Sequence, residues 1–573
     1  MKLKIFSLCR NIFSILIYLG ILIVALIPYY QGGSLILGGE GNTYLDFPTL
    51  WNKTHFAWYH TYGLGMVNMS PSGTGLNIIL LSLIQILTKS TTITNFILVL
   101  AIYFFPFLSV YILAKEMKAT SLVSFLIAFF YVVNPFTLYY LTNLNQGITF
   151  SIVVIPLSLW LIIRFYFNNF KLFFFFGLIS TCFSFAYTNY PMFAIIQISI
   201  VLSVLIANNY RNGKLFLSEA IKKYCLLLIS FLFFNAWWMV SLVNILPNIG
   251  QVYTYDFAKS WLNTVVVNTG DIIGKTFSLT TGIGADPSQN FFTYWYNQPL
   301  IKLITFIPIL LILIFFLIRK KNKKEDFLVL EVIMMLIVVL FFLKGSSMPF
   351  GVVYNFLFAH LPFFYIFKTP VEKFGILYIF LLTILLLLIF IRLKDQKFYH
   401  LVLTVFSIYL FFCSVPILSG NIIPKMYNGM KDGFYASRKY FDKVDYQRFR
   451  QTVNEDKSEY RILSLPGSAN YQVCLNNQGK SRYTGMDPVL MDINKPFIAP
   501  YNDNVSVLYN SISKEGYQKL LGFYSIKKVL LNQDTCPWFG YVHKENINEL
   551  TVILDRTMVS NFFGPLTLYE NKN

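Results

Sequence analysis

Charged residues are scarce in this sequence. They make up 13% of its 573 residues, whereas hydrophobic residues make up 56%. A typical soluble domain has roughly 25% charged residues, so the chain carries about half the usual number of solvating groups. This composition excludes a single soluble domain.

Long uncharged runs replace the missing charge. A membrane-spanning helix needs about 20 predominantly apolar residues, and such runs recur along most of the chain. The first run is followed by similar ones and by no convincing small-residue cleavage site, so we interpret it as a retained span. We therefore predict a polytopic α-helical membrane protein of about eleven spans. The predicted spans lie at residues 11–29, 92–114, 120–140, 149–167, 171–187, 190–208, 220–246, 299–318, 326–343, 374–393 and 398–416.

The net charge is +19, but the basic residues are scattered between apolar runs. Nucleic-acid binding needs a basic face on a soluble module, so we exclude it. With the N-terminus in the cytoplasm, nineteen Lys and Arg fall in cytoplasmic connections and seven in external ones, as the positive-inside rule requires. The seven external lysines are Lys53, Lys89, Lys259, Lys275, Lys344, Lys368 and Lys373.

This orientation leaves three large external loops, at residues 30–91, 247–298 and 344–373. The apolar run at residues 76–88 is too short to cross a bilayer. Treating it as a span would also move the basic cluster at residues 319–324 to the outside. We expect a helix that lies on the outer membrane surface.

Residues 417–573 have a different, more charged composition. Alternating apolar residues predict strands at residues 460–465, 527–531, 550–554 and 565–569, and residues 511–522 predict a helix. The sequence therefore predicts a transmembrane domain over residues 1–416, followed by a soluble extracytoplasmic α/β domain over residues 417–573.

Cysteines are few as well. Of the six, only Cys474 and Cys536 lie in the predicted extracytoplasmic domain, where they either pair or remain free thiols. No CxxC or Cys/His spacing indicates zinc, and we expect neither a metal nor a cofactor.

Acidic residues are nearly absent from the predicted spans. Glu331 is the exception, and its place beside a basic cluster favours a side chain that snorkels to the cytoplasmic interface. A proton relay of the transporter kind would need partners in other spans, and the sequence shows none.

The first external loop gathers acids, bases and aromatic residues. Glu40, Asp46, Lys53 and His55 lie there among tryptophans and tyrosines. Carboxylates that bind hydroxyls and aromatic rings that stack on sugars would suit a glycan site. An aromatic belt at the membrane interface explains the tryptophans and tyrosines equally well.

Several short motifs resemble one family. They are GNTYLDF at residues 41–47 with the following Trp51 and the glycine-rich stretch at residues 63–75, FKTPVEKF at residues 367–374, LLGFYSIKKVLLNQD at residues 520–534, and PLTLYEN at residues 565–571. Their order resembles the mycobacterial arabinofuranosyltransferase D family and related bacterial membrane proteins that glycosylate lipoteichoic acid. These belong to the GT-C glycosyltransferases, which use polyprenyl-phosphate sugars.

The resemblance implies an integral membrane glycosyltransferase. The donor would be a polyprenyl-phosphate sugar, the acceptor a glycan or cell-envelope polymer, and a loop carboxylate the base. The family has an acid where this chain has Asn42, so Asp46 is the first candidate base and Glu40 the second. The assigned residues are Asp46 and Glu40 as base, Lys368, Lys373, Lys53 and His55 at the donor phosphate, and Trp51, Tyr44 and Glu372 at the substrate.

Two other classes stay open. A lipid-linked sugar flippase or transporter would line several spans with buried polar residues, whereas the predicted spans are almost uniformly Leu, Ile and Phe. A non-catalytic scaffold that binds envelope polymer would tolerate the loss of Asp46.

Overall fold

The described residues of the computed structural model form two compact units. The first is drawn from residues 1–26, 100–142 and 146–422, and the second from residues 27–99 and 423–573. The structure describes residues 2–33, 35–38, 46–54, 58–59, 66–67, 75–142, 146–213, 216–243, 255–269, 271–281, 291–318, 323–421, 436–439, 444–465, 493–498, 517–533 and 544–571.

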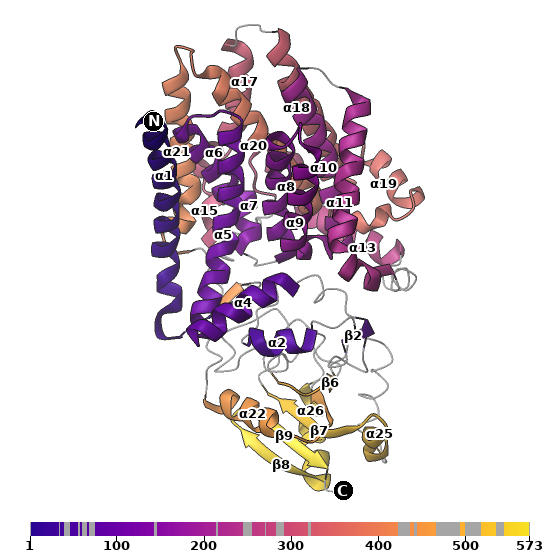
Figure 1. Cartoon of the computed structure of the whole chain (residues 1–573). Coiled ribbons are helices and arrows are strands. Elements are labelled where there is room, and N and C mark those ends of the chain that lie inside the picture. Colours follow the sequence, from indigo (N-terminus) through magenta and orange to yellow (C-terminus); the bar gives the residue numbers. More distant parts are fainter. Residues whose placement is uncertain are drawn as a thin grey trace. The chain divides into compact units, whose positions relative to one another are not determined.

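The first unit is a bundle of helices (Figure 1). They are α1 (Lys2–Leu26), α5 (Thr91–Glu116), α6 (Ser121–Val133), α7 (Pro135–Thr142), α8 (Gln146–Arg164), α9 (Asn169–Cys182), α10 (Tyr190–Asn212), α11 (Leu217–Val243), α13 (Tyr255–Thr269), α14 (Ile272–Phe277), α15 (Phe291–Asn297), α16 (Pro299–Ile304), α17 (Ile307–Ile318), α18 (Lys323–Leu343), α19 (Gly351–His360), α20 (Pro370–Leu393) and α21 (Tyr399–Leu418). Short 3-10 helices η2 (Ser184–Tyr187) and η3 (Phe364–Phe367) join some of them.

Each of the eleven predicted spans coincides with one helix or with two consecutive ones. Within the described residues, eight helices are long and apolar enough to cross a membrane, or nine if the bent pair α6–α7 is one span. The apolar helix α9 and the apolar part of α18, Phe327–Leu343, are shorter. The chain is therefore a mainly helical, multi-pass membrane protein.

Helix α20 forms the core of this unit. It packs against α18, α6, α10 and α17, and nearly all of its side chains are buried. Gly375 on α20 faces the ring of Phe136 on α7, where an added Cβ would lie 2.4 Å from Cζ. The absence of a side chain thus allows these two helices to approach closely.

The bend of 56° between α6 and α7 has a local cause. Pro135 has no N–H to continue α6, so the helix ends at Asn134. The buried Asn134 side chain donates to the carbonyls of Phe130 and Tyr131 and accepts from the N–H of Thr137, at 2.9–3.0 Å. One residue therefore caps both halves of the bent pair.

The second unit ties the first loop to the start of the C-terminal region. Strand β1 (Leu35–Gly38) pairs antiparallel with β4 (Ala436–Lys439). The buried side chain of Asn95 holds β1 in place, because its Oδ1 accepts from the N–H of Ile36 at 3.0 Å and its Nδ2 donates to the Ile36 carbonyl at 3.1 Å. Residues 27–99 and 423–573 therefore belong to one unit.

The C-terminal region is an α/β domain built on a sheet of order β6-β5-β7-β9-β8. Strands β6 (Phe497–Ile498), β5 (Arg461–Leu465) and β7 (Ile526–Asn532) are parallel, whereas β9 (Leu566–Asn571) runs antiparallel to β7 and β8 (Met558–Phe563). Helices α22 (Val444–Glu455), α25 (Tyr517–Phe523) and α26 (Lys544–Thr557) pack against the strands. The strands predicted at residues 460–465, 527–531 and 565–569 are confirmed.

One predicted strand is wrong. Residues 550–554 lie inside helix α26, although their β-branched residues favoured a strand. Leu554 is buried in the core of the sheet domain, with Ile553 packed beside it, whereas Val552 is exposed. Burial of this face of the helix on the sheet overrides the local propensity.

A buried lysine lies on the central strand of this sheet. Lys528 on β7 lies 2.7 Å from Asp456 and 3.8 Å from Glu570, and its side chain is almost fully buried. The hydrogen bond from Lys528, followed by those from Ser458, holds the pKa of the Asp456 carboxyl well below its usual range. Asp456 therefore stabilises the domain in its ionised form.

We expect Asp456→Asn to destabilise the sheet by about 1–3 kcal/mol, because a buried ammonium loses its nearest partner. The measurement is hydrogen exchange at the amides of β5 and β7 in the full chain. A lowered folded-state pKa gives stability that is present above pH ~4 and lost as the pH falls, so the difference from the wild type should shrink below that value. The exposed Glu459→Gln is the control. Equal exchange in both variants would contradict the role of Asp456.

Candidate functional site

Asp46 is the N-cap of helix α2 (Phe47–Thr54). Its Oδ1 accepts a hydrogen bond from the N–H of Thr49 at 3.0 Å, and its Oδ2 accepts one from the Thr49 hydroxyl at 2.8 Å. Aspartate is favoured at this position because it satisfies amide groups that have no partner within the helix. The same two bonds fix the orientation of the carboxylate.

A helical platform supports Asp46. Phe47 and Leu50 bury the inner face of α2 against α4 (Gly75–Thr88), and the N–H of Phe47 donates to Oε1 of Gln85 on α4 at 2.9 Å. Residues 76–88 form the predicted helix, α4, which supports α2, while its place on the outer membrane surface stays a prediction. A carboxylate on a packed helix is held more rigidly than one on a mobile loop.

The other residues predicted in the first loop are described only in part. Trp51 lies half-buried on α2, and the backbone of Lys53 continues the same helix. Glu40, Tyr44 and His55 lie outside the described residues, as does Asn42.

Lys368 lies beside an aromatic pair. It follows η3 directly, and its Nζ lies 4.3 Å from the ring centre of Phe257 and 5.2 Å from that of Trp261, both on α13. A lysine over aromatic rings gains about 0.5–2 kcal/mol from the cation–π interaction. The two rings therefore orient the ammonium group.

Lys373 lies in the first turn of α20 and is almost fully buried. Its Nζ forms an ion pair of 2.7 Å with Glu372. Glu372 therefore neutralises the charge of Lys373. Thr369 at the N-cap makes no side-chain hydrogen bond to this turn, and Pro370 follows it.

Lys344 directly follows α18, and the sequence did not single it out as a site residue. It precedes Gly345, where an added Cβ would lie 2.7 Å from the ring of Pro370 at the start of α20. Lys344 is only 5% exposed and donates to the carbonyl of Ser347 at 2.8 Å. Among the described residues, no carboxylate pairs with it. Burial lowers the pKa of its ammonium group.

Lys344, Lys368 and Lys373 stand at the two ends of the connection between α18 and α20, which the contact of Gly345 with Pro370 brings together, and we call them the lysine cluster. Glu372 pairs with Lys373 at the N-terminus of α20, where the helix dipole adds positive charge. Lys344 is a buried cation without a carboxylate partner among the described residues, and because an unmatched buried cation is costly, it favours an anionic ligand. Phosphate fits this chemistry, because lysines and helix N-termini both bind its oxygens.

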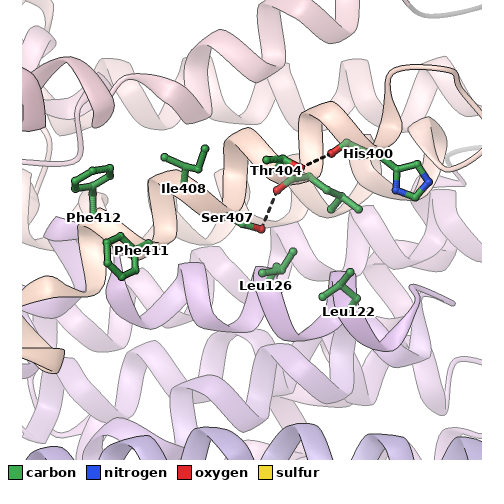
Figure 2. A pocket seen from close by; sticks show the side chains of 9 residues that line it. Leu122, Leu126, His400, Thr404, Ser407, Ile408, Phe411 and Phe412 are labelled. Carbon is green, nitrogen blue, oxygen red and sulfur yellow. Dashed lines mark hydrogen bonds between the residues drawn. The ribbon is translucent and has the colours of Figure 1, made fainter.

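A groove of about 560 Å³ lies between α6 and α21 (Figure 2). It is lined by Leu122 and Leu126 on α6 and, on α21, by His400, Leu403, Thr404, Ser407, Ile408, Phe411 and Phe412. Thr404 and Ser407 donate to the carbonyls of His400 and Leu403 on their own helix. The groove is mostly apolar and contains none of the predicted site residues, so we assign it no chemistry.

Glu331 is the acidic residue that the sequence placed within a predicted span. Glu331 on α18 accepts a hydrogen bond of 2.7 Å from Asn209 on α10, a partner that the sequence did not reveal. A neutral amide does not make a proton relay. Within the described ranges, His, Cys, Asp and Glu side chains do not gather in a group that would hold a metal.

Solved structures supply the comparison. The chain is similar to arabinofuranosyltransferase AftD from mycobacteria, with a TM-score of 0.60 and 11% identity over 98% of this chain and 40% of that one. A structure of a mutant AftD gives a TM-score of 0.58 and 10% identity, over 98% of this chain and 41% of that one. The chain has the GT-C fold. It spans about two fifths of the length of the AftD structures.

This likeness confirms the fold expected from the motifs. No family model and no curated protein matches the sequence. At this level of identity the GT-C fold is shared, and the chemistry must be argued from the residues. The two residue groups available for that argument are the Asp46 platform and the lysine cluster.

Proposed function

We propose that this chain is an integral membrane glycosyltransferase that moves a sugar from a polyprenyl-phosphate donor to a glycan or cell-envelope acceptor. The observation that carries the proposal is the lysine cluster on a GT-C fold, with Lys344 buried and without a carboxylate partner among the described residues. A phosphate group is the ligand that would neutralise it.

In the proposed reaction, an acceptor hydroxyl attacks the anomeric carbon of the donor sugar. The new bond joins the acceptor oxygen to that carbon, and the bond between the carbon and the phosphate oxygen breaks. The polyprenyl phosphate leaves with the electron pair, and the lysine cluster stabilises its charge. The carboxylate of Asp46 accepts the hydroxyl proton, a role that its fixed orientation supports.

The remaining site residues complete the proposal. Glu40 is the second candidate for the base, while Lys53 and His55 support the donor phosphate. Trp51 and Tyr44 bind sugar through their rings, and Glu372 orients Lys373 through their ion pair.

The proposed orientation places the first loop and the C-terminal domain outside the cytoplasm. It rests on the nineteen basic residues of the predicted cytoplasmic connections, against seven in the external ones. A polyprenyl-phosphate sugar would then present its phosphate at the outer headgroup level.

The test is a transfer assay with the full chain in right-side-out vesicles. Polyprenyl-phosphate donors with labelled pentoses or hexoses are placed in the bilayer, and envelope oligosaccharides too polar to cross it are added outside. We expect acceptor-dependent release of polyprenyl phosphate and labelled oligosaccharide. Movement of the intact donor between leaflets without sugar transfer would support the flippase instead. Binding of the oligosaccharide without turnover of any donor would support the scaffold.

A further inference from the structure

The connection between α18 and α20 has almost no charged residues, which is unusual for a segment exposed to water. Residues 345–367 contain no Asp, Glu, Lys or Arg, and a single histidine, His360. The connection was expected to be an external loop. External loops in water are normally rich in polar and charged residues.

Helix α19, inside this connection, is apolar on its packed face, and its unpacked face is apolar except for Asn355 and His360. Tyr354 and Phe358 are buried, whereas Val352, Val353 and Phe356 are exposed. A helix with apolar side chains on both faces is typical of a protein core or of a membrane.

The exposed apolar surface continues on both sides of α19. Met348 and Phe350 precede the helix, and Leu361 and Phe363 follow it, all with large exposed areas. Phe350 and Phe363 also have left-handed backbones, with φ of +64° and +62°. Such backbones are strained for a residue with a side chain, and here each carries a phenyl ring that is exposed.

Helix α13 extends this surface toward the lysine cluster. Its Tyr255 packs against Phe358 of α19, with ring centres 6.0 Å apart. Phe257 and Trp261 on α13 are about half exposed, and Lys368 lies over both rings. Aromatic rings with a lysine above them are typical of a membrane–water interface.

The connection is also anchored beside the membrane at both ends. It starts at the end of α18 and returns into α20, a membrane span, and these two helices pack along each other. Lys344 and Lys368 stand at its two ends. The segment therefore leaves the bundle and returns to it at neighbouring points, and a lysine flanks it at each of these points.

We propose that residues 345–367, together with Phe257 and Trp261, form a re-entrant element that is embedded in the headgroup and upper acyl region of the bilayer. Its partner is phospholipid. Transfer of exposed apolar surface from water to acyl chains stabilises this arrangement and offsets the strained backbones. The inference does not depend on glycosyl transfer. If the proposed function holds, the lysine cluster lies at headgroup depth, and a lipid-linked phosphate reaches it without leaving its leaflet.

Three phenylalanines of nearly equal exposure provide a matched test. Phe356 on α19 is 61% exposed, Phe411 on the span α21 is 59% exposed, and Phe562 on β8 of the sheet domain is 65% exposed. Each is replaced singly by p-benzoylphenylalanine in the full chain. The proteins are reconstituted in vesicles of phosphatidylcholine and phosphatidylglycerol with labelled acyl chains, and illuminated. We expect Phe356 to cross-link to lipid with a yield close to that of Phe411 and several-fold above that of Phe562.

The unmodified protein gives an independent measurement. Vesicles with a diazirine either near the glycerol or at the end of the acyl chain should label residues 348–363 more strongly from the first position. Lipid labelling of Phe356 no higher than that of Phe562 would overturn the inference, as would labelling of residues 348–363 only from the chain end. Both readouts are independent of activity, so a failed transfer assay would leave this inference intact.

Discussion

Asp46→Asn is expected to lower the rate of sugar transfer by roughly 10²–10⁴-fold, because the variant can no longer accept the proton of the acceptor hydroxyl. This substitution should remove proton acceptance without disturbing the local fold. Asparagine is as good an N-cap as aspartate, and its Oδ1 can still accept the N–H of Thr49, so α2 should keep its start. Donor binding should change much less than turnover. The measurement is single-turnover transfer from a polyprenyl-phosphate sugar.

The controls separate the base from its support. Thr49→Val removes the hydroxyl bond to Asp46 but keeps the carboxylate, so it should cost much less activity than Asp46→Asn. Glu40→Gln tests the second candidate, which Asn42 makes necessary. If Asp46→Asn keeps full transfer and Glu40→Gln loses it, the base is Glu40, six positions earlier. Full activity in both would remove the first loop from the chemistry.

Lys344→Met and Lys368→Met should each raise the KM for the donor by roughly 10- to 100-fold. A charge-assisted bond to phosphate contributes about 1.5–3 kcal/mol, and each 1.4 kcal/mol is a factor of ten. Lys344→Met should weaken donor binding without lowering the thermal stability of the protein. Because Lys344 is buried without a carboxylate partner among the described residues, an apolar side chain of similar length should leave thermal stability unchanged or raise it. Titration of the donor and a thermal melt of the same preparation measure both effects.

Lys259→Met is the matched control for Lys368→Met. Lys259 is exposed on α13 and lies over the ring of Tyr255 at 5.7 Å, so it also makes a cation–π contact. We expect its loss to leave the KM unchanged. Equal KM values in Lys344→Met, Lys368→Met and the wild type would return both lysines to a role as membrane anchors. Lys373→Met is less informative, because it would leave Glu372 without its ion pair.

The first-loop prediction shows where local sequence stops being sufficient. The motif at residues 41–47 pointed to Asp46, and the structure adds that Thr49 holds both of its oxygens. Capping also explains an aspartate before a helix without any catalysis. Asp46→Asn separates these two roles, because asparagine keeps the cap but cannot accept a proton, and Thr49→Val measures what the hydroxyl bond alone contributes.

The sequence by itself determined the membrane class, the spanning helical segments and three strands of the C-terminal sheet, β5, β7 and β9. These follow from local composition and from periodicity, which act over a few consecutive residues. It also indicated the GT-C fold through motifs at both ends of the chain and in one middle loop.

Only the tertiary structure decided which side chains act together. Lys344 and Lys368 are 24 positions apart in the sequence, and a lysine after an apolar run looks alike whether it anchors a helix or binds an anion. The packing of Gly345 on Pro370 brings the ends of this connection together, and Phe257 and Trp261 come from a separate loop. Tertiary packing likewise turned residues 550–554 into a helix, because burial of Leu554 on the sheet outweighs a β-propensity of at most about 1 kcal/mol. Burial, partners and charge balance are properties of non-local contacts, which no local pattern records.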